Sequence, residues 1–288
     1  MRFKELAESR TGNRVRVEIY PNSQLYKDRE ELDALRLGAV QMIAPSLSKL
    51  ASLGGADFEF FDLPFLFKDR AAFRTVVNGP VGLSLLKKLE PSGVRGLAFW
   101  DNGFKVFTAN RPLQTVGDFK NQRIRVQASR VLLTQMKSLG ASVSVSPLTN
   151  VYESLKRSQL DGQENSPSNI YTQRLHEVQS NLTVSNHGYL AYAVIVNKPF
   201  WDKLPHDVRL TLEGALREAT LYEHDIAEQE NNRALAQIRA SGKVKIYTLS
   251  ADERNQWRAA LTPVYQEARG RISSETFSSV NSLMGTPP

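Results

Sequence analysis

Residues 94–109 read VRGLAFWDNGFKVFTA, two apolar segments joined by the tripeptide Asp101-Asn102-Gly103. Residues 94–100 and 104–109 have the length and apolar content of strands, and the tripeptide predicts a tight turn between them. Two strands that follow one another so directly can carry the chain out of one lobe and into another. We therefore expect a chain of two lobes, with this stretch as one of the crossings.

The flanking segments alternate between strand and helix patterns. Residues 15–20 (VRVEIY) alternate apolar and polar side chains, which predicts a strand, while Asp28 and Glu31 have the spacing of a capping box. The further predicted strands are residues 40–44, 122–127, 141–145, 189–196 and 244–247. The further predicted helices are residues 69–89, 129–139, 150–157, 168–178 and 251–273. This alternation is typical of an α/β fold with a helix-flanked mixed sheet in each lobe.

A helical pattern runs from Pro205 to about residue 240. At ~1.5 Å per residue it would be roughly 50 Å long, more than the width of one lobe, so we expect it to bridge both. We assign residues 1–102 and about 190–230 to lobe I. Residues 103–189 and about 231–288 form lobe II, and a ligand cleft is expected between the lobes.

Composition narrows the class of protein. The 288 residues include 41% hydrophobic and 23% charged side chains, so a soluble globular protein is expected, and no apolar stretch approaches the ~20 residues of a membrane span. The aromatic stretch FEFFDLPFLF, residues 58–67, is interpreted as core. The net charge of +7 comes from basic residues spread along the chain rather than clustered, so no nucleic-acid partner is expected.

Sequence motifs for catalysis are absent. There is no cysteine, which excludes a thiol nucleophile and thiolate metal sites, and the four histidines have no metal-ligand spacing. Nucleophile-elbow, phosphate-loop, dinucleotide-binding and zinc-protease motifs are missing as well. We therefore predict that the chain is not an enzyme and uses no cofactor or metal.

The sequence does contain residues that are suited to binding a ligand. Arg123 and Arg125 alternate along the predicted strand QRIRVQ and so point to one face. An arginine there is either paired with a carboxylate of the chain or available to clamp a ligand carboxylate, for which a planar guanidinium is suited. Lys105, just past the predicted turn, can supply a second positive charge, and the polar loop DGQEN, residues 161–165, can supply an amide.

Together these segments resemble the solute-binding proteins of tripartite ATP-independent periplasmic (TRAP) transporters, in the DctP-like group and its C4-dicarboxylate branch. The resemblance covers nearly the whole chain. Six short segments in the family's order and spacing carry it: YPNSQL (residues 20–25), LGAVQM (37–42), LPF (63–65), DNGFK (101–105), QRIRV (122–126) and DGQEN (161–165).

The resemblance implies roles for individual residues. Arg125 matches the strand arginine that binds the ligand carboxylate, Asn165 the amide beside it, and Lys105 the basic position after the predicted turn. Two positions, Pro45 and Ser46, match residues that line the cleft from lobe I. Leu148 stands where many relatives place an aromatic residue over the ligand, and this departure bears on the shape of the pocket.

The implied function is that of a periplasmic monomer which captures a small organic acid, with a C4-dicarboxylate expected, and delivers it to the small and large permease subunits in the membrane. The resemblance implies a signal peptide, a strand and a loop before the helix that begins here at Arg2, and we expect this sequence to lack all three. Two alternatives stay open, a two-lobed enzyme acting on a small carboxylic acid and a sensor that presents its ligand to a receptor.

Overall fold

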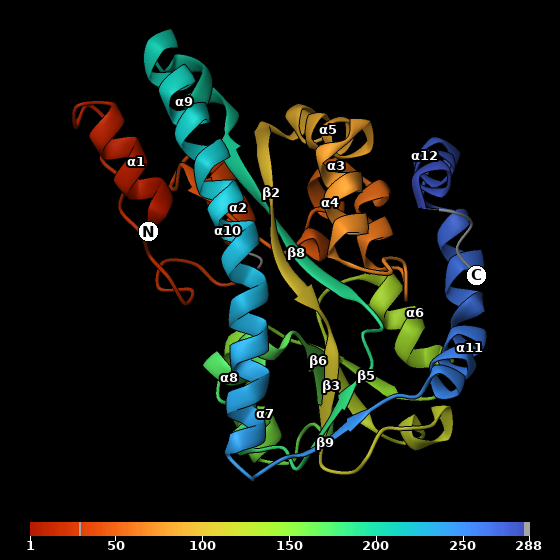
Figure 1. The fold of residues 1–288 in the computed structure, drawn as a ribbon. Coiled ribbons are helices and arrows are strands. Elements are labelled where there is room, and N and C mark those ends of the chain that lie inside the picture. Colours follow the sequence, from red (N-terminus) through yellow and green to blue (C-terminus); the bar gives the residue numbers. More distant parts are fainter. Residues whose placement is uncertain (29, 285–288) are drawn as a thin grey trace.

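The protein is built on two β-sheets, seen in a computed structural model that describes residues 1–28 and 30–284 (Figure 1). The first sheet has the strand order β1-β8-β2, and its described pairings are all antiparallel. Its strands are β1 (Met42–Ile43), β8 (Tyr189–Asn197) and β2 (Val94–Phe104). β8 is buried along nearly its whole length, as expected of a central strand.

The second sheet is mixed, with the order β5-β4-β6-β3-β7-β9. Its strands are β5 (Ser142–Val145), β4 (Arg123–Val126), β6 (Gly162–Asn165), β3 (Val106–Ala109), β7 (Asn181–Val184) and β9 (Lys245–Thr248). β3 runs antiparallel to both of its neighbours, while β4 is parallel to β5 and β6. The two sheets therefore meet where β2 ends and β3 begins.

Helices cover both sheets. The α-helices are α1 (Arg2–Arg10), α2 (Glu30–Leu37), α3 (Ala51–Gly54), α4 (Arg70–Asn78), α5 (Pro80–Lys87), α6 (Arg130–Ser138), α7 (Val151–Lys156), α8 (Pro167–Thr172), α9 (Lys198–Lys203), α10 (His206–Ala240), α11 (Ala251–Arg269) and α12 (Ser274–Met284). The 3-10 helices are η1 (Leu47–Lys49), η2 (Ala56–Asp62), η3 (Glu90–Ser92), η4 (Val116–Phe119), η5 (Leu148–Asn150) and η6 (Leu175–Glu177). Within the described residues, no helix is both long and apolar enough to span a bilayer.

The long helix α10 connects the two halves, as the sequence predicts. It packs against β2 of the first sheet and against α8 beside the second, and Figure 1 shows it running past both. The two-lobed α/β fold with a bridging helix is thus confirmed. How the chain is divided between the lobes stays a prediction, and residue 29 and residues 285–288 of that division lie outside the described part.

The predicted turn at residues 101–103 is wrong. β2 continues through these residues to Phe104, and a register shift between Asp101 and Gly103 marks a bulge. The tripeptide stays paired with β8, and the Asp101 N–H donates to Glu223 of α10 at 2.9 Å, which ties this part of β2 to the long helix. Gly103 has φ of +150°, and a Cβ there would lie 2.7 Å from the Arg70 side chain, so the bulge requires glycine.

The predicted strand at residues 15–20 is also absent. The Val17 N–H donates to Glu8 Oε1 at 2.9 Å and the Val17 carbonyl accepts from Lys4 Nζ at 2.6 Å. The backbone here is therefore bonded by side chains of α1, and no strand of the described chain pairs with it. Alternation predicts a two-faced segment, but a strand also needs a neighbour.

Capping at the second helix differs from prediction. Asp28 and Glu31 do not form a capping box, because both carboxylates bind Lys49 Nζ, at 2.6 and 2.7 Å. Instead, Glu30 accepts from the Lys27 N–H at 3.2 Å. These acidic side chains tie α2 to η1, which follows the cleft-lining segment predicted at residues 45–46.

Two predicted helices are interrupted. Residues 69–89 form α4 and α5, separated at Gly79, because Pro80 cannot donate a hydrogen bond to the preceding turn. Residues 168–178 form α8 and then η6, with Arg174 in the left-handed region at φ 58° between them. Asp69 caps the start of α4, since its carboxylate accepts from the Ala72 N–H at 2.8 Å.

The aromatic stretch at residues 58–67 is core, as predicted. Phe58, Phe60 and Phe61 are almost fully buried and belong to one cluster with Ile124 of β4 and Trp257 of α11. This cluster continues from the first sheet to the second, so the two lobes share apolar packing on the side of α6 and α11.

Candidate ligand-binding site

Arg125 is the most unusual buried side chain of the second sheet. β4 places it 1% exposed, and its Nε and Nη2 donate to the Ser146 carbonyl at 2.9 and 2.6 Å. Nη1 is buried without a hydrogen-bond partner, and no carboxylate of the described chain lies within 4.0 Å of the guanidinium. Burial lowers the pKa of Arg125, but an arginine stays protonated. The site thus holds a buried charge with a free donor.

Arg123, two residues earlier on the same strand, behaves differently. Its guanidinium is exposed and forms a bidentate ion pair with Asp161, in which Nε donates to Oδ2 at 2.9 Å and Nη2 to Oδ1 at 2.7 Å. The pairing with a carboxylate of the chain, one of the two alternatives for this strand, therefore applies to Arg123. Arg125 fits the other alternative.

Asn165 lies on the neighbouring strand β6, which pairs with β4 in parallel. Its Oδ1 accepts from the Ser166 N–H at 3.0 Å and from Asn169 Nδ2 at 2.8 Å. These two donors fix the orientation of the amide, and Nδ2 is buried without a partner in the described structure. The free groups of Arg125 and Asn165 are both donors, so they match a ligand that offers acceptors.

Lys105 follows the end of β2 and is also 1% exposed. Its ammonium lies 3.0 Å from Glu164 Oε2 and 3.9 Å from Asp62 Oδ1. Burial would raise the pKa of Glu164, but the nearby Lys105 ammonium is the main influence that outweighs burial, and the pKa is lowered to about 2. Lys105 therefore already has an ionised partner inside the protein.

The groups around this ion pair respond to burial. The pKa of Asp62 is raised by desolvation, although Lys105 opposes the rise. The pKa of His187 is lowered by desolvation despite the nearby Glu164, so His187 is neutral at pH 7. One buried cation, Lys105, thus faces one firmly ionised carboxylate, Glu164.

Pro45 and Ser46 come from the first lobe, and both are buried. The Pro45 carbonyl accepts from the Ala193 N–H at 3.1 Å, and Ser46 forms an isolated bridge with Tyr192. The Ser46 hydroxyl donates to Gln127, the residue that follows β4. The structure therefore brings the Ser46 segment to the strand that carries Arg125.

Leu148 begins η5 and is half-buried. It packs against an apolar cluster that includes Val151 and Leu155 of α7. The Ser146 carbonyl, two residues earlier, accepts from the Arg125 guanidinium, so the segment that precedes Leu148 contacts the arginine. Within the described part of the chain, the Leu148 side chain packs in this cluster and not against the other predicted site residues.

Sequence reasoning missed three polar side chains of this region. Gln127 contacts Ser46, Asn169 orients Asn165, and Tyr192 lies beside the Ser46 segment. A signal existed for Gln127, which shares a strand face with Arg125 at a spacing of two. Tyr192 is one of two tyrosines in the otherwise apolar predicted strand of residues 189–196, whereas the contact of Asn169 depends on the capped start of α8.

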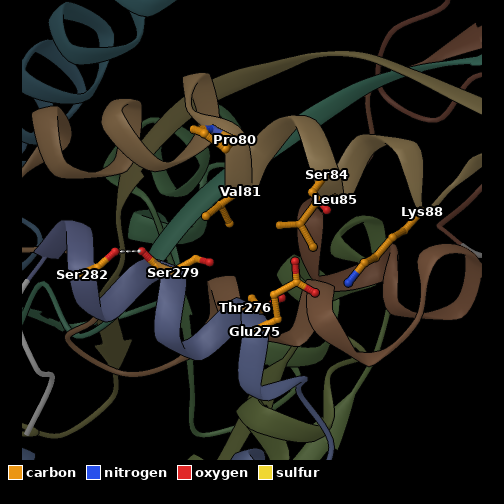
Figure 2. A pocket seen from close by; sticks show the side chains of 9 residues that line it. All are labelled: Pro80, Val81, Ser84, Leu85, Lys88, Glu275, Thr276, Ser279 and Ser282. Carbon is orange, nitrogen blue, oxygen red and sulfur yellow. Dashed lines mark hydrogen bonds between the residues drawn. The ribbon is translucent and has the colours of Figure 1, made fainter.

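A separate cavity of about 260 Å³ lies between α5 and α12 (Figure 2). Lys88 and Glu275 are among its lining residues, together with several serines, and none of the predicted site residues takes part. Lys88 is itself paired with Asp57. The cavity therefore has no connection to the buried donors of Arg125 and Asn165.

Known proteins resemble this chain over almost all of its length. The model of the DctP family, described as bacterial extracellular solute-binding protein, family 7, matches residues 1–271. The C4-dicarboxylate-binding periplasmic protein DctP of Rhodobacter capsulatus is 53% identical over 279 residues, which cover 97% of this chain and 84% of the relative.

Two solved structures also resemble this chain over most of its length. A TRAP periplasmic solute-binding protein from Shewanella oneidensis, with bound succinate, has a TM-score of 0.95 and 39% identity, covering 98% of this chain and 92% of that one. Another from Pseudomonas aeruginosa, with bound L-malate, has a TM-score of 0.89 and 37% identity, with 92% of each chain covered.

Proposed function

The chain belongs to the DctP family of bacterial extracellular solute-binding proteins, and from this premise we propose that it binds a C4-dicarboxylate and delivers it to a TRAP permease. The family is one of transport proteins, which confirms the prediction that the chain is not an enzyme. The observation that carries the ligand proposal is the buried Arg125 guanidinium with no carboxylate partner in the described structure.

Arg125 and Asn165 bind one carboxylate of the ligand. A carboxylate can accept from Arg125 Nη1 and Asn165 Nδ2 together. Each of these buried donors, which has no partner in the described structure, then gains a hydrogen bond. Leaving a buried donor unpaired costs on the order of 1–3 kcal/mol, and more when the group is charged. The ligand therefore relieves an energetic cost that the unliganded site carries.

The remaining predicted residues complete the proposed cleft. Pro45 and Ser46 line it from the first lobe, and Leu148 forms an apolar wall that leaves more room than an aromatic side chain would. Lys105 is the second cation, but a ligand carboxylate would share its ammonium with Glu164. We therefore expect Lys105 to contribute less to affinity than Arg125.

Closure couples binding to transport in this proposal. Ligand contacts from both lobes exist together only in the closed form, so binding shifts the population toward closure. The closed form then docks on the small and large permease subunits in the periplasm. The hinge consists of the β2–β3 crossing and α10, which both lobes share.

Melting temperature with a panel of acids tests the ligand class. A ligand that binds only the native state raises stability by mass action, so succinate, malate or fumarate should raise the melting temperature with concentration. Keto acids and sugar acids serve as the comparison. A rise with a sugar acid and none with any C4-dicarboxylate would contradict the proposed ligand.

A further inference from the structure

Tyr192 lies between the two groups of ligand residues. It belongs to β8 of the first sheet, where it pairs with Trp100 and forms an isolated bridge with Ser46. Its side chain is half-buried. It therefore stands in the first lobe beside the proposed cleft-lining segment, and nothing so far gives its hydroxyl a role.

The hydrogen bonds around Tyr192 have a defined direction. The Ser166 N–H can only donate, so Asn165 must turn Oδ1 toward it, and Asn169 must then present Nδ2 to the same oxygen. Asn169 Nδ2 carries two hydrogens. The Asn169 amide also lowers the pKa of the Tyr192 hydroxyl, which burial raises.

The Asn102 amide donates a hydrogen bond to the Tyr192 hydroxyl. Asn102 Nδ2 lies 2.6 Å from the Tyr192 oxygen, and Asn102 Oδ1 accepts from the Ser168 hydroxyl at 3.3 Å. Burial raises the pKa of Tyr192 while the amides of Asn169 and Asn102 oppose the rise, so the hydroxyl keeps its proton at neutral pH. Its oxygen is used as an acceptor, and among the described residues its proton has no acceptor.

We propose that Tyr192 is a specificity-determining residue that donates its hydroxyl proton to the end of the ligand remote from Arg125. The inference rests on the proposed function and extends it. Three free donors then surround the ligand, Arg125 and Asn165 from the second sheet and Tyr192 from the first. Such a set favours a ligand with acceptors at both ends, as an ionised dicarboxylate has, over an acid with one apolar end.

Titration calorimetry with succinate and butyrate tests this, because both acids have four carbons and only succinate has an acceptor at each end. In Tyr192→Phe the affinity for succinate should fall roughly 10- to 100-fold, as expected for a hydrogen bond to a charged group. The affinity for butyrate should not change. The measured quantity is therefore the ratio of the two affinities.

Tyr189→Phe is the matched control. Tyr189 lies three residues earlier on β8, and its hydroxyl donates to Asp101 at 2.6 Å in the core. This variant should lower the melting temperature and keep the ratio of the wild-type protein.

Each other outcome overturns the inference. An unchanged ratio in Tyr192→Phe shows that the hydroxyl does not reach the ligand. An equal loss of both affinities shows that Tyr192 acts only through the structure. A wild-type protein that binds neither succinate nor any other C4-dicarboxylate removes the proposed function itself, and the assignment of Tyr192 falls with it.

Discussion

Arg125 and Lys105 are both 1% exposed, yet their surroundings are opposite. Lys105 lies 3.0 Å from the ionised Glu164, whereas Arg125 is held, among the residues described, by the Ser146 carbonyl alone and keeps one donor free there. A buried cation with a carboxylate partner is explained by the folded chain alone. A buried cation without one costs several kcal/mol, so its retention points to a partner from outside the chain.

The different surroundings of Lys105 and Arg125 also imply different roles, Lys105 in stability and Arg125 in ligand binding. Lys105 and Glu164 join the crossing after β2 to β6, so their pair contributes to the junction of the lobes. Arg125 contributes little to that junction. Variants of the two cations should therefore have opposite effects on folding and on affinity.

The largest expected effect on folding is that of Lys105→Met. Removing the ammonium leaves Glu164, whose side chain is fully buried, as an uncompensated charge. Loss of one partner of a buried pair costs about 3–5 kcal/mol, which urea unfolding at pH 7 would measure. The double variant Lys105→Met/Glu164→Gln should recover much of the loss. Equal destabilisation by Arg125→Met would break the comparison.

Acid sensitivity gives a smaller effect. The pKa of Glu164 is lowered from 4.5 to about 2, so its contribution to stability is complete above pH 4.5 and is lost as the pH falls toward 2. Glu164→Gln lacks this contribution and should be the less stable protein at pH 7. Its deficit, on the order of 1.4 kcal/mol per pKa unit, should shrink as unfolding is measured at pH 4.5 and below. A constant deficit would show that the pair does not lower this pKa.

The smallest effect is expected for Arg123→Ala. This guanidinium is exposed, and exposed ion pairs such as that with Asp161 contribute about 0–1 kcal/mol. Both the unfolding free energy and the affinity for succinate should stay close to wild type. A large loss of affinity would place Arg123 in the site and remove the distinction between the two arginines.

Much of the fold was predictable from local pattern. The long helix from Pro205 and the apolar strand that became β8 carry strong periodic signals, and the structure has both. The wrong predictions concern segments whose conformation depends on contacts with other elements of the fold. Residues 15–20 alternate like a strand but bond to α1, and residues 101–103 have turn composition yet are held in β2 by a contact with α10.

The candidate site, like the fold, was predictable only in part from the sequence. Strand alternation and the family resemblance identified Arg125 and Asn165 as candidate ligand-binding residues. The structure places them on neighbouring strands. Which of two arginines has a carboxylate partner depends on Asp161, which sequence spacing alone does not place beside Arg123. The direction of the Asn165 and Asn169 amides depends on a single backbone N–H, that of Ser166, and only coordinates reveal it.

The central claim is that the unpaired Arg125 binds the ligand carboxylate, and titration calorimetry of Arg125→Met with succinate tests it most directly. The account predicts a loss of affinity of at least about 100-fold, since a charged hydrogen-bonded contact is removed, with an unfolding free energy at or above that of wild type. Wild-type affinity for succinate in a folded Arg125→Met protein would contradict it.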